Sequence, residues 1–268
     1  MFEGKIGKLV YEVSHKLIPN PESNSYTNHI HNFCELLLFI SGDVEFNIDG
    51  QMYSPKPYDL FLIPPTTYHY IIPNKDTPYE NYVIDFSGEL IPEKHYQRIF
   101  TPNYRMNIRK DQDFVRYFSM LDHYHAIYDK EDFDECALML IRELLVYCSY
   151  QTRALDNDEA SDNPLVRSIV DYVSENLTEA LDAETIAKHL YLSKSYIQNI
   201  FSGNMHIGLK QYILQKKIYA AHAEIERGAS PGEVCKKYQF NDYTGFYRLY
   251  KKFFGMSPKA MVSGNSLK

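Results

Sequence analysis

Three things are scarce in this 268-residue sequence: tryptophan is absent, cysteine occurs only four times, and long apolar runs are missing. A membrane-spanning helix needs about 20 consecutive apolar residues, so no membrane partner is expected. The N-terminus lacks a signal-peptide pattern, which favours the cytoplasm. The cysteines are scattered without the paired spacing of zinc sites. We therefore interpret them as buried, reduced thiols; they are Cys34, Cys136, Cys148 and Cys235.

Basic residues are also in deficit, since 28 Lys and Arg oppose 35 Asp and Glu and give a net charge of -7. As an average, this charge argues against nucleic-acid binding. Divided near Ser161, however, the chain carries about +4 in its C-terminal part and about -11 in the rest. The basic charge is thus segregated, as a protein that binds nucleic acid requires.

The stretch from Leu181 to Met261 repeats one design twice. Each copy predicts a short helix, a tight turn and a second helix with polar and aromatic residues on one face, which is the pattern of a helix-turn-helix motif. In the first copy, Asp182 caps the short helix and Ser193 caps the next. One long helix over 208–227 is expected between the copies. It would set the distance between two helices that enter successive major-groove segments.

The second copy carries further helix signals. Ser230, Pro231 and Glu233 predict a capping box with proline at the first helical position. Asn241 or Asp242 is expected to cap the following helix. A helical bundle that binds no nucleic acid is the alternative, but the paired motifs and the segregated charge argue against it.

Several runs in these copies resemble the AraC/XylS family of transcription regulators. The most specific is the closing run Lys251-Lys252-Phe253-Phe254-Gly255-Met256-Ser257-Pro258. Two others are Ala187-Lys188-His189-Leu190 and Phe240-Asn241-Asp242-Tyr243. The resemblance implies double-stranded promoter DNA as a partner, and RNA polymerase as a further partner if the protein is an activator.

The resemblance also places base-facing positions on the second helix of each copy. Gln198 and Asn199 have the groups for a bidentate contact to adenine, and Arg248 has those for guanine. Basic residues near the end of the second copy are placed for phosphate. The predicted DNA-binding residues are Ser195, Tyr196, Gln198, Asn199, Tyr243, Thr244, Tyr247, Arg248, Lys251 and Lys252.

The first copy departs from the family pattern in its cationic residues. Ser202 and Gly203 stand where two lysines are common, and Asn199 stands where arginine is common. We therefore expect the second copy, through Lys251 and Lys252, to supply more of the salt-dependent affinity for DNA.

Residues 1–90 alternate short apolar runs with turn residues and predict an all-β sandwich or small barrel. The Asp49-Gly50 pair predicts a hairpin between two of the strands. In the same region, His29-x-His31-x-x-x-Glu35, together with His69, looks like a cupin, a β-barrel that directs His and Glu toward one site. AraC-type regulators often carry such a cupin-like sensor, which commonly works without metal.

The cupin-like residues have two interpretations. His29 and His31 share a strand face because side chains alternate with a period of two, and Glu35 joins them if the strand is regular. Three imidazoles and a carboxylate suit a divalent transition metal, although no cofactor is required. Alternatively they line a small-molecule pocket, for which the abundant tyrosines suit a sugar. The predicted metal ligands are His29, His31, Glu35 and His69, and the predicted effector-binding residues are these four with Tyr58 and Tyr82.

Residues 111–150 change to helical periodicity and predict two amphipathic helices that break near Asp129. The resemblance implies that they form a homodimer contact, and packing on their own barrel alone is the alternative. Small and acidic residues over 152–163 predict a linker, after which Pro164 opens a helix. The predicted domains are a cupin-like effector-binding barrel over 1–110, a helical dimerisation segment over 111–151, the linker over 152–163, and the DNA-binding domain over 164–268.

The predicted fold class is multidomain: an all-β cupin-like barrel with two following helices, then an all-α domain with two helix-turn-helix motifs. The predicted function is a sequence-specific DNA-binding transcription regulator, not an enzyme, controlled by a small-molecule effector. A sugar in carbohydrate utilisation is the favoured effector. Two alternatives stay open: a metal-dependent cupin enzyme, and a DNA-binding regulator whose barrel senses no small ligand. The enzyme alternative leaves the paired motifs and the charge segregation unexplained.

Overall fold

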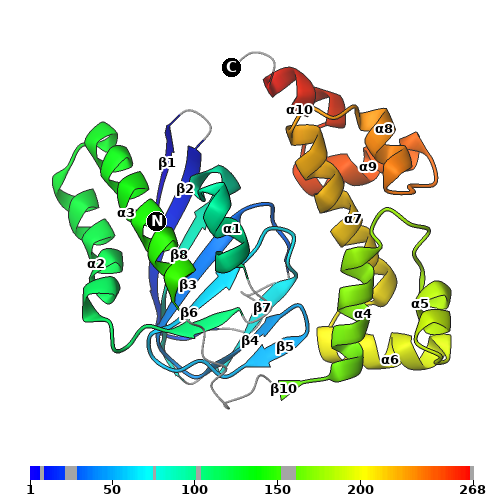
Figure 1. Ribbon diagram of the computed structural model, residues 1–268, viewed down its shortest axis with the longest axis horizontal. Helices are drawn as coiled ribbons and strands as arrows, with labels where there is room; N and C mark the ends of the chain where they lie inside the picture. The colour runs from blue at the N-terminus through cyan, green and yellow to red at the C-terminus, as the bar shows by residue number, and fades with distance from the viewer. Residues whose placement is uncertain (7–8, 22–28, 75–76, 101–103, 152–160, 266–268) are drawn as a thin grey trace. The chain divides into compact units, whose positions relative to one another are not determined.

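The computed structural model describes residues 1–6, 9–21, 29–74, 77–100, 104–151 and 161–265 (Figure 1). The chain folds into two compact units. The N-terminal unit comprises most residues up to Ser161, and the C-terminal unit comprises the residues from Asp162 together with the short segments Ile30–Asn32 and Asp49–Gln51. The N-terminal unit is rich in sheet and the C-terminal unit is helical, which confirms the predicted fold class. Among the described residues, no helix is both long and apolar enough to cross a membrane.

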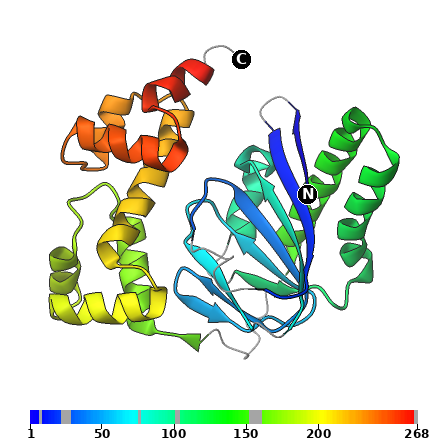
Figure 2. The ribbon, with the colours of Figure 1, turned by 180° about the vertical axis from the view of Figure 1, so that it is seen from behind.

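Two sheets make up most of the N-terminal unit (Figures 1 and 2). The larger sheet is antiparallel, with the order β1-β2-β8-β3-β6-β9. Its strands are β1 (Phe2–Ile6), β2 (Leu9–Ile18), β3 (Cys34–Ser41), β6 (Asp59–Ile63), β8 (Tyr79–Phe86) and β9 (Arg105–Asn107). In the smaller sheet β5, β4 and β7 are neighbours in that order; they span Gln51–Tyr53, Val44–Ile48 and His69–Pro73.

The larger sheet buries both of its faces, because successive side chains along a strand point to opposite sides. Leu37 and Phe39 of β3 pack into a core shared with the smaller sheet. Leu36 and Leu38 point the other way, into a core shared with the helices that follow the barrel. The predicted hairpin between β4 and β5 is present, and Asp49 and Gly50 both have positive φ, as its turn requires.

Two long helices follow the sheets, as the periodicity of 111–150 predicted. They are α2 (Gln112–Ile127) and α3 (Lys130–Tyr150), and they lie side by side against the larger sheet (Figure 1). Asp111 and Asp129 cap them by accepting hydrogen bonds from the N–H groups of Phe114 and Asp132. A short 3-10 turn η2 (Gly88–Leu90) and α1 (Glu93–Ile99) precede them, inside the range predicted to be all-β. Their apolar residues are too few to give a periodic signal, yet they close one end of the core.

The C-terminal unit consists of helices throughout its described residues after Asn163. They are α4 (Pro164–Glu175), α5 (Ala183–His189), α6 (Lys194–Met205), α7 (Leu209–Glu226), α8 (Pro231–Lys237), α9 (Tyr243–Phe254) and α10 (Pro258–Asn265). The predicted caps Asp182, Ser193 and Asp242 each accept a hydrogen bond from a backbone N–H in the first turn. The long helix expected over 208–227 is α7.

One local prediction, the capping box at Ser230, needs correction, and another, the linker, lies mostly outside the described residues. Ser230 precedes α8 with Pro231 at the first position, but its side chain makes no capping hydrogen bond, so the predicted capping box is wrong. The residue is exposed, and solvent competes for the polar groups at this helix end. Of the predicted linker, 152–160 lie outside the described residues. Ser161–Asp162 form the two-residue strand β10, and Asn163 caps α4.

Candidate DNA-reading helices and ligand sites

The first helix-turn-helix motif is built by α5, a tight turn and α6. The N–H of Leu192 donates to the carbonyl of Ala187 across the turn, at 2.9 Å. Tyr191 lies between them with a φ of +56°, in the left-handed region. Ser193 then caps α6 directly by accepting from the N–H of Tyr196 at 3.2 Å. The turn therefore fixes where the second helix begins.

The second motif repeats this turn in α8 and α9. The N–H of Phe240 donates to the carbonyl of Cys235 at 3.1 Å, and Gln239 has a φ of +56°. One additional residue, Asn241, precedes the cap Asp242, whose carboxylate accepts from the N–H of Gly245 at 2.7 Å. The two short helices are thus 48 residues apart in the sequence, whereas the two second helices are 49 apart. We call α6 and α9 the reading helices.

Each reading helix buries one face and exposes the other. Ile197 and Phe201 of α6 are buried, and so are their counterparts 49 residues later, Phe246 and Tyr250 of α9. All ten residues predicted to bind DNA are exposed on these two helices, at Ser195, Tyr196, Gln198, Asn199, Tyr243, Thr244, Tyr247, Arg248, Lys251 and Lys252. The structure therefore leaves these side chains accessible to a duplex, and their contacts with DNA stay a prediction.

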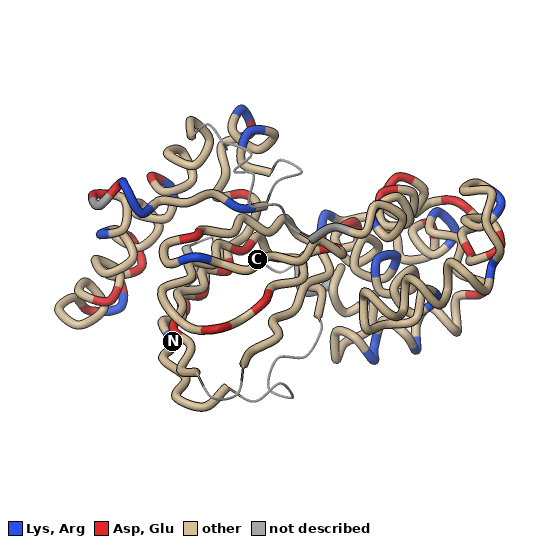
Figure 3. The backbone as a smooth tube through the Cα atoms, turned by 90° about the horizontal axis from the view of Figure 1, so that it is seen from below, with Lys and Arg blue, Asp and Glu red and all other residues tan. Residues whose placement is uncertain are grey.

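The reading helices differ in charge at their C-terminal ends. Lys251 and Lys252 lie in the last turn of α9 and are exposed, whereas Ser202 and Gly203 occupy the same places in α6. Figure 3 shows Lys and Arg distributed along the helices of the C-terminal unit. Phosphate contacts depend on such cations, so the difference marks α9 as the stronger candidate for binding the DNA backbone.

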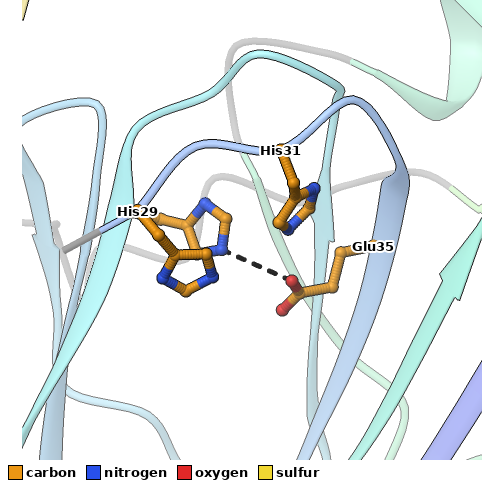
Figure 4. Close-up of side chains that lie close together, drawn as sticks. His29, His31 and Glu35 are labelled. Atoms are coloured by element: carbon orange, nitrogen blue, oxygen red, sulfur yellow. Dashed lines mark ion pairs between the residues drawn. The ribbon is translucent and has the colours of Figure 1, made fainter. Parts of the chain in front are cut away.

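The four predicted metal ligands come together (Figure 4). Each of His29, His31, Glu35 and His69 offers one ligand atom, and these atoms all lie within 4.8 Å of one another. Glu35 and His69 are buried, His31 is half-buried and His29 is exposed, so the cluster has one accessible side. We call these four residues the histidine cluster.

The backbone route to the histidine cluster differs from the prediction. His29 and His31 were expected on one face of a regular strand with Glu35, but β3 begins only at Cys34. His29 instead forms an isolated bridge with His69, with two backbone N–H to carbonyl hydrogen bonds of 3.2 Å. The chain bends at Asn32 and Phe33 before it enters β3. The regular-strand assumption was wrong, and a bend brings the residues together.

One hydrogen bond orients the ring of His69. Its Nδ1 lies 3.0 Å from the carbonyl oxygen of Thr67, which can only accept, so Nδ1 carries a proton. Its Nε2 lies 3.4 Å from Oε2 of Glu35. In a neutral imidazole this Nε2 holds a lone pair that faces a carboxylate, and the two acceptors repel. A proton on Nε2 or a cation between the two groups removes the repulsion.

The two remaining effector-binding candidates lie elsewhere. Tyr82 is paired with Leu38 on the face of the larger sheet that looks toward the helices, whereas Glu35 points to the opposite face. Tyr58 and Tyr82 both line a cavity of about 240 Å³ between this sheet and α2, which we call the helix-side cavity. The structure therefore does not bring the six predicted effector residues into one site.

Sequence reasoning missed the polar network beside the helix-side cavity. His15 Nε2 lies 2.9 Å from Glu80, and His15 Nδ1 lies 2.9 Å from Asp122. The hydroxyl of Tyr82 donates to the same Asp122 carboxylate at 2.6 Å. Burial, and then this hydrogen bond, raise the pKa of Tyr82, so its hydroxyl stays protonated. The partners are 40 to 107 residues apart, so no local pattern signals them.

Comparison with known proteins assigns a family to each unit. Residues 18–144 match the model of the AraC-like ligand binding domain, and residues 186–263 match that of a helix-turn-helix domain. The arabinose operon regulatory protein of Salmonella typhimurium is 23% identical over 253 residues, which cover 85% of this chain and 83% of that protein. The Msm operon regulatory protein of Streptococcus mutans is 29% identical over 105 residues, or 39% of this chain and 38% of that protein's length.

Among solved structures, ToxT from Vibrio cholerae O395 aligns over 95% of this chain and 98% of its own, with 11% identity and a TM-score of 0.39. The two family models match, in the same order, the sheet-rich unit and the unit with the reading helices. The homologues are transcription regulators. This chain therefore belongs to the AraC/XylS family of transcription regulators and is not an enzyme.

Proposed function

We propose that this protein binds promoter DNA through α6 and α9 and is controlled by a sugar that binds its N-terminal unit. The single observation that carries the DNA part is the pair of matched reading helices, each with a buried apolar face and an exposed polar one. The sugar part is supported by the likeness to an arabinose operon regulatory protein. A cytoplasmic location and, if the protein activates transcription, contact with RNA polymerase belong to the same proposal.

The test is a binding titration of the full chain with labelled promoter fragments from its own locus. We expect binding at low ionic strength, with at least about tenfold preference over shuffled DNA, since specific sites are bound far more tightly than non-specific ones. Arg248→Ala should relax specificity and cost about 1–3 kcal/mol if Arg248 contacts guanine. Equal affinity for promoter and shuffled fragments would contradict the proposal.

We further propose that the protein is a homodimer that associates through α2 and α3. Exposed large hydrophobic side chains on these helices include Ile127 at 56%, Met139 at 65% and Tyr150 at 66%. Sedimentation velocity should show a dimer that Met139→Glu weakens, because the change places a charge in an apolar contact. Leu17→Glu, at an exposed position of β2, is the matched control and should leave the dimer intact. A monomer at micromolar concentration contradicts this assignment.

The histidine cluster supports one additional proposal, that it holds a divalent transition-metal ion. Three imidazoles and a carboxylate suit such an ion, and the bond from His69 Nδ1 to Thr67 leaves Nε2 for the metal. Bound metal would supply a cation among these groups. Elemental analysis after dialysis against Zn²⁺ or Co²⁺ should find one ion per chain.

Variants separate this metal site from adventitious binding. His69→Ala and Glu35→Gln should lose the ion, whereas His123→Ala, which removes an exposed histidine of α2 outside the cluster, should retain it. Co²⁺ absorbance would report the same loss through the coordination geometry. Equal metal content in all four proteins would show that the ion is bound elsewhere.

A further inference from the structure

We infer that the regulatory ligand occupies the helix-side cavity, and that this ligand is a neutral monosaccharide. The inference rests on the proposed function, since it names the place and size class of the effector. The cavity measures about 240 Å³ and lies between the larger sheet and α2. Pockets for drug-sized ligands measure about 300–1,000 Å³, so this smaller one suits a single sugar ring.

The lining of the cavity has the mixed character that a sugar ring requires. Leu38, Ile40 and Phe118 provide apolar surface, and Tyr82 adds an aromatic ring. Such surface packs against the C–H groups of a pyranose. Glu80 and Ser119 supply a carboxylate and a hydroxyl at the same cavity. Sugar hydroxyls can donate to the carboxylate, and a charged acceptor makes the stronger hydrogen bonds.

Two backbone irregularities meet at this cavity. The pairing of β3 with β8 shifts register between Phe39 and Ser41, so Ile40 occupies a β-bulge. Tyr58 has a φ of +70°, which is rare for a bulky aromatic residue, and its backbone is held by hydrogen bonds to Phe39 and Ile108. Bulges and residues in such conformations gather at ligand sites, where they direct side chains that a regular strand would not.

The polar network beside the cavity holds two of its lining residues in place. His15 bridges Glu80 and Asp122, and its ring stacks on Tyr82 with 3.9 Å between ring centroids. The Tyr82 hydroxyl is bonded to Asp122 at 2.6 Å. The network therefore holds Glu80 and Tyr82 in position, and preorganisation of this kind lowers the entropic cost of binding.

The position of α2 would couple ligand binding in the cavity to the spacing between this helix and the sheet. One wall is formed by Val115, Arg116, Phe118 and Ser119, all from α2, and the facing wall comes from the sheet. A ring bound between them would contact both, so its affinity depends on the spacing of helix and sheet. Because a ligand shifts an equilibrium by its differential affinity for two arrangements, the sugar would favour one position of α2.

The histidine cluster is the competing place for the effector. It lies on the other face of the larger sheet, where Leu37, Phe39, Phe46, Phe61 and Tyr79 already fill the space between the sheets. Within the described residues, the measured cavity is bordered by none of the four cluster residues. This filling of the space between the sheets favours the helix-side cavity as the place for a sugar ring.

The experiment is calorimetric titration of the full chain with L-arabinose, D-galactose and D-glucose, each alone. We expect one of them to bind. Ser119→Phe, which fills the cavity from an exposed helical position, should abolish the binding. Glu80→Gln, which keeps the volume, should weaken it roughly tenfold, since a hydrogen bond to a charged group is lost. His123→Phe is the control, because it places the same ring one turn further along α2.

The outcomes separate this inference from the proposed function. If His69→Ala abolishes sugar binding while Ser119→Phe retains it, the effector lies at the histidine cluster and the inference is overturned. If none of the three monosaccharides binds at millimolar concentration, the ligand class is wrong. Promoter binding by the same samples then decides independently whether the protein remains a DNA-binding regulator.

Discussion

Single residues in the two turns hold conformations that their side chains do not favour. Tyr191 is 94% exposed, has a φ of +56° and contributes its side chain to neither core. The left-handed region costs an L-residue roughly 1–2 kcal/mol, and glycine avoids this cost while losing more chain entropy on folding. A residue that adopts positive φ at lower cost than Tyr191 should therefore stabilise the first turn.

Tyr191→Gly should accordingly raise the free energy of unfolding by about 0.5–1 kcal/mol. Urea denaturation followed by circular dichroism measures this change. Tyr191→Val tests the cause in the opposite direction, since a β-branched residue suits the left-handed region least. We expect the glycine variant to be the most stable, wild type to be intermediate and the valine variant to be the least stable. Any other order would mean that the backbone φ at residue 191 does not determine the stability difference.

Asp182 makes the N-terminus of α5 sensitive to acid. Its carboxylate accepts hydrogen bonds from the backbone N–H and the hydroxyl of Thr185, each at 2.8 Å, and these bonds lower its pKa from the ordinary value of 3.8. A lowered folded-state pKa gives stability that is present above the unfolded pKa and is lost as the pH falls through the folded one.

Asp182→Ala should therefore cost about 0.5–2 kcal/mol at pH 7, the usual loss for a removed N-cap. The difference from wild type should shrink as the pH falls below 3.8 toward the folded pKa. Chemical denaturation at several pH values provides the measurement. A difference that stays constant down to pH 2 would assign the loss to packing alone.

At the scale of single helices, Gly245 is a position in α9 where protein stability and DNA affinity should respond to substitution in opposite directions. It is exposed in the first turn, and the three atoms nearest to a Cβ built there belong to Asp242, at 3.4 to 3.7 Å. A methyl group thus fits, and no neighbouring helix demands glycine. We therefore expect the glycine to permit close approach of the DNA backbone.

Gly245→Ala should then stabilise the protein by about 0.5–1 kcal/mol, because alanine is the better helix former. The same substitution should weaken promoter binding, which a titration against DNA would measure beside the denaturation curve. Unchanged DNA affinity would leave the glycine without a role in recognition.

The reading helices also allow a paired test of phosphate binding. Lys251→Gln with Lys252→Gln should reduce the magnitude of the slope of log affinity against log salt by about 1.8, at about 0.9 per phosphate contact. Ser202→Lys with Gly203→Lys should steepen it, since both positions are exposed and nothing lies within 4 Å of a Cβ at Gly203.

The control for this test is Lys94→Gln with Lys110→Gln, which removes two exposed charges from the N-terminal unit. Their removal should leave the slope unchanged. If the control flattens the slope as much as the α9 variant, net charge rather than helix position governs the affinity.

At the scale of the whole molecule, metal binding should couple to folding. A ligand present at 100 times its dissociation constant stabilises the native state by about 2.7 kcal/mol. We expect Zn²⁺ at that concentration to stabilise the protein by a similar free energy, measured as a rise in melting temperature. Glu35→Gln should abolish this rise. Because protons compete with the metal for the imidazole nitrogens, the stabilisation should be lost in acid. A shift that persists at pH 5 would contradict ligation by the histidines.

Local signals predicted the C-terminal unit well, because its elements are specified by caps and spacing within a few residues. Asp182, Ser193 and Asp242 are such signals. The N-terminal unit depends on contacts between distant residues. Which face of β8 carries Tyr82, and its bond to Asp122, follow from strand order and helix packing. Local sequence patterns indicate neither the sheet face of Tyr82 nor its hydrogen bond to Asp122. The helix-side cavity was therefore not predicted.

Strand β3 presents Glu35 to the space between the sheets and Leu38 to α2. A single extended segment thus borders both the proposed ion site and the proposed sugar site. The two binding equilibria are then linked. If the ion increases the affinity for the sugar by some factor, the sugar increases the affinity for the ion by the same factor. A cell short of the metal would, in that case, respond to the sugar only at a higher sugar concentration.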